Sequence, residues 1–380
     1  MSLQEQVISE FQERYDGAPA YVVRAPGRVN LIGEHTDYND GFVMPMAIDR
    51  ATWIALSPRN DGQVKLYSMD FNETVSFSLG HFENNDSGWL EYVKGMAWVL
   101  KAAGYRLNGW NGVIAGDVPV AAGLSSSAAV ELATARAFAA ISDVPWQPAV
   151  IARLAQRAEN EWVGVSCGIM DQMISAAGVE GTALLIDCRS LETTNAPLPP
   201  DTAVVVLDTA TRRGLVDSAY NERRSQCEEA ARFFGVAALR DVSLADFEAR
   251  AGELDDLTRR RARHVITEND RTLAAAEAMK AGDAVTLGKL MNASHTSLRD
   301  DFEVSSDALN SMVNCAQGHA GCFGARMTGA GFGGCAVALV AVDQVDDFVA
   351  HVEQCYQQAT DLQPNIYVCQ PTNGAELLRG

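Results

Sequence analysis

The segment Gly116–Ala140 constrains the fold most strongly, because a loop of small residues runs directly into an alanine-rich helix. An apolar segment at Gly109–Ala115 precedes it, so the pattern predicts a strand, a loop and a helix in succession. We expect the serines at 125–127 to cap the helix. A helix N-terminus offers unpaired N–H donors and a positive dipole end, and small residues let a phosphate approach the backbone. The segment therefore predicts either a phosphate site or an ordinary serine-capped helix.

Two glycine-containing motifs differ from familiar nucleotide-binding loops. The loop before the alanine-rich helix is not a Walker A motif, because no Gly-Lys-Ser/Thr follows a glycine at the required spacing. The cluster Met327–Cys335 satisfies G-x-G-x-x-G, but a dinucleotide fingerprint follows a strand and opens a helix. This cluster instead precedes an apolar, strand-like segment at Cys335–Val342. It indicates a loop beside a ligand, or a strand entry that needs close backbone approach.

A dense polar cluster lies in the segment Arg24–Gly41, after a β-like entry. Glu34, His35 and Asp37 bring three hydrogen-bonding side chains together directly after Gly33. Such density suits a small polyhydroxylated ligand, since each hydroxyl held by a charged partner contributes roughly 1.5–3 kcal/mol. A site built on such bonds rejects an analogue that lacks one hydroxyl. The alternative is a charged surface turn.

One isolated acid stands in the segment Cys167–Ser175, which is otherwise apolar and begins a helix. Asp171 lies among isoleucines and methionines there. A carboxylate in these surroundings is either a helix cap or a catalytic base.

The acidic composition narrows the classes of partner. The chain has 380 residues and a formal net charge of −19, with the acids spread along it. This balance argues against binding of nucleic acid or of an acidic membrane surface. A protein of this charge that binds an anionic nucleotide needs local backbone donors, one or two arginines and a divalent cation.

The eight cysteines form no Cys-x-x-Cys pair and accompany no histidine pattern, so we expect reduced thiols rather than a zinc site or a disulfide framework. The segment at residues 1–10 is polar and acidic and resembles no secretory signal. The longest apolar runs are strand-sized and too short to cross a bilayer. These features predict a soluble, cytoplasmic protein.

The periodicity predicts two halves. Short alternating segments separated by turns precede residue 80 and predict an antiparallel sheet, whereas long amphipathic helices dominate after residue 216. The proline-rich segment Asn195–Asp201 is the best candidate linker. We therefore expect an α/β (α+β) protein with domains at 1–198 and 199–380.

Together these segments resemble the GHMP small-molecule kinases and, within them, the galactokinases. The resemblance spans nearly the whole chain, and its parts occur in the family's order and spacing. One glycine motif alone is weak evidence, whereas five matching segments are specific. The segments are Arg24–Tyr38, Gly123–Ala129, Cys167–Gln172, Tyr220–Arg224 and Met327–Cys335.

The resemblance implies a two-domain fold, with an N-terminal mixed sheet and helices and a C-terminal ferredoxin-like domain. It implies ATP-dependent phosphorylation of D-galactose at the anomeric O1 hydroxyl, with Mg²⁺ as cofactor. A kinase for N-acetylgalactosamine or arabinose, or a paralogue that senses galactose and ATP without turnover, is the alternative. The implied partners are small molecules rather than nucleic acid or membrane, and a monomer is expected.

The resemblance also assigns roles to individual residues. Asp171 would be the catalytic base, and Arg28 would stabilise developing charge at the transferring phosphoryl group. Alanine replaces a common family glycine at positions 121 and 330, which would cost about 1–2 kcal/mol at each position that requires positive φ. The residues expected to bind the sugar are Glu34, His35, Thr36, Asp37 and Tyr220; those expected at the ATP phosphates are Ala121, Ala122, Gly123, Leu124, Ser125, Ser126 and Ser127; those expected at Mg²⁺ are Ser127 and Glu159.

Overall fold

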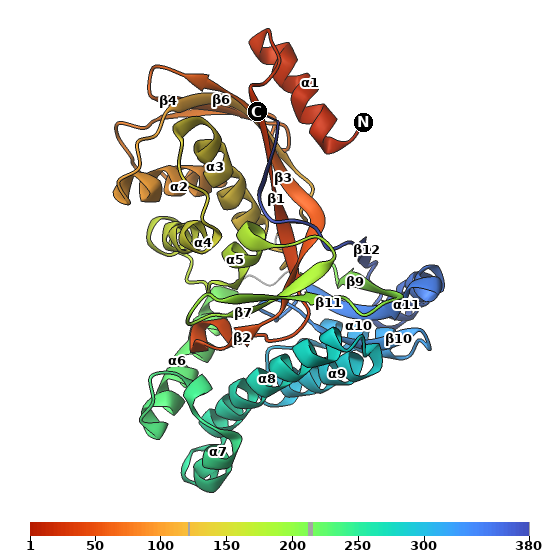
Figure 1. Ribbon diagram of the computed structural model, residues 1–380. Coiled ribbons are helices and arrows are strands. Elements are labelled where there is room, and N and C mark those ends of the chain that lie inside the picture. The colour runs from red at the N-terminus through yellow and green to blue at the C-terminus, as the bar shows by residue number, and fades with distance from the viewer. Residues whose placement is uncertain (121, 212–215, 380) are drawn as a thin grey trace.

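A mixed six-stranded sheet forms the centre of the first half of the molecule (Figure 1). The computed structural model describes residues 1–120, 122–211 and 216–379. Among the strands described, β4 and β6 are the parallel pair, and the other neighbours in this sheet are antiparallel. In sheet order the strands are β13 (Glu376–Arg379), β1 (Tyr21–Asn30), β3 (Pro45–Arg59), β6 (Gly109–Gly116), β4 (Gln63–Ser68) and β5 (Glu73–Ser78).

Helices cover both faces of this sheet, so β1 is buried along almost its whole length. One face carries α1, whose Val7 and Phe11 pack in one cluster with side chains of the four strands β1, β3, β4 and β6. Five alanines of α3, among them Ala128 and Ala129, are fully buried and let this helix lie close to the opposite face. These helices are α1 (Leu3–Tyr15) on one face and α2 (Leu90–Ala102), α3 (Ser126–Ser142), α4 (Pro148–Arg157) and α5 (Met170–Ala177) on the other side, as Figure 1 shows.

The second half contains a four-stranded antiparallel sheet with helices packed against it. Its strands occur in the order second, third, first, fourth, which is the expected ferredoxin-like arrangement. In sheet order they are β10 (Cys322–Met327), β11 (Cys335–Ala341), β9 (Thr202–Asp208) and β12 (Asn365–Cys369). The helices are α6 (Val216–Phe234), α7 (Leu244–Arg250), α8 (Asp256–Lys280), α9 (Ala284–Asp300), α10 (Asp307–Gln317) and α11 (Val345–Thr360).

An apolar core joins the two halves and fixes the position of the polar segment at 24–41. Val29 and Ile32 from the first half pack in one cluster with Val206, Met291 and Val337 from the second. A small sheet lies beside this junction, and α8 contacts two of its strands. Its strands are β2 (Phe42–Val43), β7 (Thr182–Asp187) and β8 (Thr193–Pro197).

The proline-rich segment at 195–201 is only in part a connection. Its first residues belong to β8, which pairs with β7 through contacts such as Ala183 with Ala196. The last strand also crosses the expected division, because β13 pairs with β1 in the sheet of the first half. Residues 199–380 therefore contribute to both large sheets.

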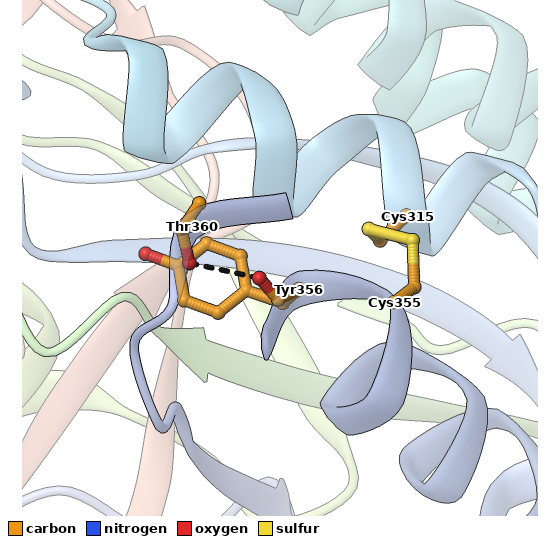
Figure 2. The surroundings of a disulfide bond; sticks show 4 residues. All are labelled: Cys315, Cys355, Tyr356 and Thr360. Atoms are coloured by element: carbon orange, nitrogen blue, oxygen red, sulfur yellow. Dashed lines mark hydrogen bonds between the residues drawn. A yellow bond between two sulfur atoms is a disulfide. The ribbon is translucent and has the colours of Figure 1, made fainter. Parts of the chain in front are cut away.

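The expectation that all cysteines are reduced thiols is wrong. Cys315 on α10 and Cys355 on α11 form a disulfide, with a Cα–Cα distance of 5.7 Å (Figure 2). Both helices are amphipathic and pack together, which brings together two residues 40 positions apart that no spacing motif connects. The other six cysteines have free thiols.

In the part of the chain that the structure describes, no helix has both the length and the apolar character needed to span a bilayer.

Candidate active site

A cavity of about 230 Å³ lies where the polar segment meets three other segments of the chain. Arg28 and Glu34 line it from the end of β1 and the following loop. Asp171 lines it from the start of α5, Tyr220 from α6, and Ala330 from the loop between β10 and β11. Four of the five matching sequence segments thus meet around one space.

Arg28 and Asp171 form a bidentate pair at one wall of this cavity. Arg28 Nε lies 2.8 Å from Asp171 Oδ1, and Arg28 Nη2 lies 2.8 Å from Asp171 Oδ2. Burial lowers the pKa of Arg28, but the charges of Asp171 and Glu34 outweigh it and raise the pKa above its ordinary value. The site therefore contains a permanent cation aligned with a carboxylate, in the geometry of a strong charge-assisted pair.

Ser125 joins this pair instead of capping α3, so the expected capping role is wrong for this serine. Its backbone has a positive φ of 60°, and it makes no side-chain cap hydrogen bond. Its hydroxyl donates to Asp171 Oδ2, while Arg28 Nη1 donates to the Gly123 carbonyl. The left-handed backbone of Ser125 places its hydroxyl next to Asp171, a charged acceptor, instead of at the amides of the first helical turn.

The loop before α3 lies beside this pair, since Arg28 Nη1 donates to the Gly123 carbonyl. Gly123 has a positive φ of 79°, and Ala122 and Leu124 are buried. Because no side chain caps α3, the amides at its first turn can face an anion. Ala121 lies outside the residues that the structure describes.

Glu159 lies in a π-helical turn, Ala158–Val163, and hydrogen-bonds with the Ser127 hydroxyl. The carboxylate is only 5% exposed, and burial together with the charge of Asp171 raises its pKa to about 7. A bound divalent cation would stabilise the ionised carboxylate of Glu159 against the effects of burial and of the charge of Asp171. Mg²⁺ sites on nucleotides typically take one or two protein ligands besides phosphate oxygens and water, so the two residues fit such a site. In the described ranges, no group of three or more His, Cys, Asp or Glu residues could hold a metal ion.

The residues expected to bind sugar do not all face the cavity. Glu34, His35, Asp37 and Tyr220 line it. Thr36 is fully buried, and its hydroxyl lies 2.8 Å from the Gly33 carbonyl oxygen and 2.7 Å from the Phe42 carbonyl oxygen, so it donates to one of these two backbone acceptors. Its position does not support a direct sugar contact and indicates a role in closing the loop.

Asp37 approaches the backbone closely at Gly168. A Cβ atom at Gly168 would lie 1.6 Å from Asp37 Oδ2, so the absence of a side chain makes room for this carboxylate. Burial, followed by the charges of Asp171 and Glu34, raises the pKa of Asp37 to about 7. Within the described chain the Tyr38 amide donates to Asp37 Oδ1 over 3.0 Å, so the carboxylate keeps acceptor capacity for donors that a ligand brings.

His35 is neutral at physiological pH, because burial lowers its pKa to about 3. It adopts a positive φ of 62° and packs against Tyr220, with ring centroids 5.6 Å apart. Its Nδ1 lies 2.8 Å from the Tyr38 hydroxyl and its Nε2 lies 3.2 Å from the Ala330 carbonyl. Both ring nitrogens are therefore engaged by the protein, and the ring supplies a wall of the cavity.

Sequence reasoning missed a second cavity of about 370 Å³ that adjoins the start of α3. Ser126 and Ser127 line one part of it, and Phe71 and Trp89 line another. The two aromatic rings are nearly parallel, with an interplanar angle of 9°. These aromatic residues lie in loops without periodicity, so only their folded position beside the phosphate loop reveals them.

Comparison with known proteins agrees with this geometry. The galactose-binding signature of galactokinases matches residues 9–58, and the N-terminal and C-terminal domains of GHMP kinases match 91–179 and 275–356. A galactokinase from Roseiflexus sp. (strain RS-1) is 49% identical over 369 residues, which cover 96% of this chain and 94% of that protein. This chain belongs to the galactokinase family.

Two solved structures share the overall fold of this galactokinase-family chain. A galactokinase from Lactococcus lactis, crystallised with galactose, superposes with a TM-score of 0.92 at 37% identity and covers 98% of both chains. The mevalonate kinase of Methanococcus jannaschii has a TM-score of 0.67 at 19% identity, over 94% of this chain and 99% of that one. The second likeness concerns the fold alone.

Proposed function

We propose that this chain transfers the γ-phosphoryl group of ATP to the O1 hydroxyl of D-galactose. The observation that carries the proposal is the Arg28–Asp171 pair, which lies between the polar cavity and the loop that begins α3. A sugar in the cavity and a phosphate at the loop would meet at this pair. The family membership and the galactose-bound relative support galactose as the sugar.

Asp171 would accept the proton of the attacking hydroxyl as the O–P bond forms. Arg28 would donate hydrogen bonds to the transferring phosphoryl group, where negative charge accumulates. Glu34, Asp37 and Tyr220 would hold the sugar so that O1 points at Asp171, and positioning of this kind supplies much of the catalysis in phosphoryl transfer.

We propose that Ser127 and Glu159 hold Mg²⁺ together with the phosphates. When bound, the cation would neutralise charge on the β- and γ-phosphate oxygens. Its charge would also favour the ionised form of Glu159, whose pKa burial has raised to about 7.

The nucleotide base would occupy the second cavity, between Phe71 and the start of α3. The parallel aromatic rings there suit a planar ring, and Ser126 and Ser127 line the same cavity. This arrangement supports ATP as donor, since base and phosphates would bind along one continuous surface.

A coupled ADP-release assay with a panel of sugars tests the proposal. We expect turnover with galactose and much weaker turnover with N-acetylgalactosamine and arabinose. Preference for either of these sugars would reassign the substrate. Measurable galactose binding without ADP release from any sugar would instead support a sensor.

We also propose a monomeric state, which the resemblance implies, and a cytoplasmic location, which the sequence features predict. Light scattering coupled to size exclusion tests the first. Cell fractionation tests the cytoplasmic location, and the Cys315–Cys355 disulfide is a reason to test it directly, because disulfides are rare in the cytosol.

A further inference from the structure

The loop that carries Glu34 is held by one face of α8 from the second half of the molecule. The Gly33 amide donates to Glu268 Oε1 over 3.0 Å, and the Phe42 amide donates to Asn269 Oδ1 over 2.9 Å. His264 Nε2 lies 3.1 Å from the Glu34 carbonyl oxygen. Burial lowers the pKa of His264 to about 4, so the ring is neutral and Nε2 carries the hydrogen that this carbonyl accepts. Positions 264 and 268 are one helical turn apart, which aligns both contacts.

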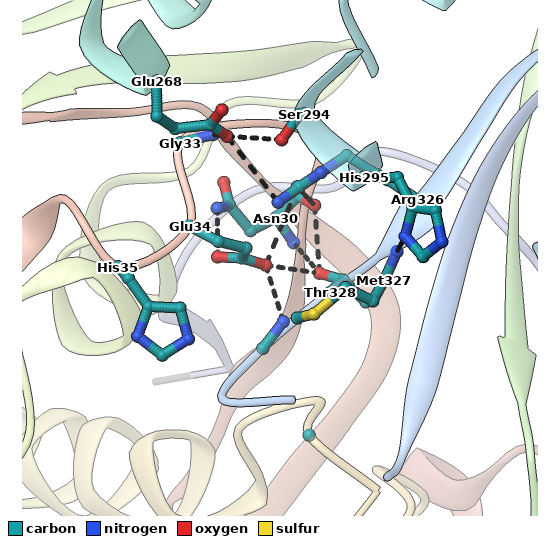
Figure 3. A network of polar contacts seen from close by, with 12 residues as sticks. Asn30, Gly33, Glu34, His35, Glu268, Ser294, His295, Arg326, Met327 and Thr328 are labelled. Atoms are coloured by element: carbon teal, nitrogen blue, oxygen red, sulfur yellow. Dashed lines mark hydrogen bonds and ion pairs between the residues drawn. The ribbon is translucent and has the colours of Figure 1, made fainter. Parts of the chain in front are cut away.

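Glu268 is a fully buried carboxylate at the centre of this contact (Figure 3). Besides the Gly33 amide, its Oε1 accepts from the Ser294 hydroxyl over 2.6 Å, and its Oε2 accepts from Arg271 Nε over 2.7 Å. Burial raises the pKa of Glu268, but the charges of Arg271 and other neighbours outweigh it and hold the pKa at about 2. Glu268 is therefore ionised throughout the physiological range.

Arg326 links this carboxylate to Glu34. The guanidinium is fully buried; its Nη2 lies 3.8 Å from Glu268 Oε1, and its Nη1 lies 3.7 Å from Glu34 Oε1. Nη1 also donates to the Asn30 carbonyl over 3.2 Å. Figure 3 shows the guanidinium between the two acids. One buried cation is thus shared by two buried anions, one of which lines the sugar cavity.

The two oxygens of Glu34 differ in their remaining capacity. Oε1 accepts from the Gly329 amide over 2.6 Å, and the Thr328 hydroxyl, which lies 3.0 Å from both Oε1 and the Asn30 carbonyl oxygen, donates to one of these two acceptors. Because Arg326 Nη1 also lies 3.7 Å from Oε1, donors of the protein surround this oxygen. Oε2 accepts from Asn30 Nδ2 over 2.6 Å. Since a carboxylate oxygen accepts two hydrogen bonds, Oε2 retains capacity for one sugar hydroxyl.

We propose that Glu268 is a positioning residue for sugar recognition, although it does not line the cavity. It fixes the Gly33 amide and balances the charge of Arg326, and both contacts keep Oε1 of Glu34 engaged and Oε2 directed at the sugar. Without the negative charge of Glu268, Arg326 would interact with Glu34 alone and draw the carboxylate toward itself. This inference rests on the proposed function, because it takes Glu34 as a sugar ligand.

Glu268→Gln tests the role with galactose and the set of monodeoxygalactoses. The variant Glu34→Gln first identifies the sugar hydroxyl that Glu34 binds. One deoxy sugar should be a poor substrate for the wild type but not for Glu34→Gln relative to galactose, and the hydroxyl that this sugar lacks is the one that Glu34 recognises. We expect Glu268→Gln to raise the KM for galactose about tenfold, to change kcat by less than about threefold, and to weaken discrimination against that same deoxy sugar. Discrimination against the other deoxy sugars should be retained.

Glu277→Gln is the matched control, because it makes the same change on the exposed side of α8, where Glu277 pairs with Lys280. It should leave every constant unchanged. If Glu268→Gln does not fold, Ser294→Ala removes one contact of Glu268 Oε1 without a charge change and should weaken the same discrimination to a smaller extent.

A uniform rise in KM for all sugars, or an unchanged KM, in the folded variant would overturn the inference. The proposed function fails separately, if the wild type releases no ADP with any sugar. In that case calorimetry measures the dissociation constants of galactose and of each deoxy sugar. We expect Glu268→Gln to weaken the discrimination against the same deoxy sugar in these constants.

Discussion

Gly168→Ala should disable the sugar site through a single methyl group. The ideal Cβ position is 1.6 Å from Asp37 Oδ2 and 2.2 Å from Asp37 Cγ, so the carboxylate and the methyl group cannot both keep their places. Gly168 does not adopt a positive φ, and alanine therefore fits its backbone. The conflict should be resolved by rotation of the Asp37 side chain out of the cavity.

The size of the effect follows from the bond that would be lost. A hydrogen bond between a hydroxyl and a carboxylate contributes about 1.5–3 kcal/mol, which corresponds to a rise of about 10- to 150-fold in the KM for galactose. The value of kcat should fall less, because Arg28 and Asp171 keep their pairing. Steady-state ADP release at saturating ATP measures both constants, and Gly252→Ala, at a position with no atom within 4 Å of the added Cβ, is the control.

A double-mutant cycle isolates the clash. In the background Asp37→Ala the space beside Gly168 is free, so adding Gly168→Ala should raise KM no further. Additive effects, or a single Gly168→Ala variant with a KM within twofold of the wild type, would refute the assignment of Asp37 to the sugar.

Four further outcomes are expected. Asp171→Asn should lower kcat by about 10²–10⁴-fold while calorimetry still detects galactose binding; substantial residual turnover contradicts the role as base. Arg28→Ala should lower kcat more than it raises KM, and a pure KM effect contradicts its role at the transition state. Burial raises the pKa of Asp37 from 3.8 to about 7, so the folded state binds the proton more tightly and folding stability is lost as pH rises between these values. The Tm of Asp37→Asn relative to that of the wild type should therefore be higher at pH 8 than at pH 5. A Tm difference that does not change with pH contradicts the shift. Thiol titration of the denatured, unreduced chain should find six thiols, and replacing both Cys315 and Cys355 by alanine should lower the unfolding free energy by about 4 kcal/mol; eight titratable thiols would exclude the disulfide.

Features that depend on neighbouring residues could be predicted from the sequence. The loop and helix at 116–140 and the long helices after residue 216 match the structure, because hydrophobic periodicity and small-residue composition act locally. The ferredoxin-like strand order, which the structure confirms, was implied by the family resemblance and not by these local patterns. The polar character of the segment at 24–41 was also evident from composition. That segment lines the cavity that also contains Asp171 and Tyr220, as its density of charged groups indicated.

Features that depend on contacts between distant segments could not be predicted from local patterns. Arg28 and Asp171 are 143 positions apart, and Ser125 turns from its expected cap to Asp171 only because that carboxylate is close in the fold. Glu268 lies in one of the long helices expected after residue 216, yet nothing in the periodicity of this helix distinguishes Glu268 from the surface acids beside it. The aromatic pair of the second cavity could not be predicted for the same reason, since the stacking of Phe71 on Trp89 is a tertiary contact.

The return of β13 to β1 has a consequence for how the protein can be synthesised. Arg24 on β1 meets Glu376 on β13 across 352 positions, with the two side chains 3.3 Å apart. While the ribosome is still translating the second half, β1 has β3 on one side and an open hydrogen-bonding edge on the other, and such edges recruit other strands. The strand that carries Arg28 therefore keeps this open edge until residues 376–379 have been synthesised, and truncation before residue 376 should yield aggregation rather than a smaller active enzyme.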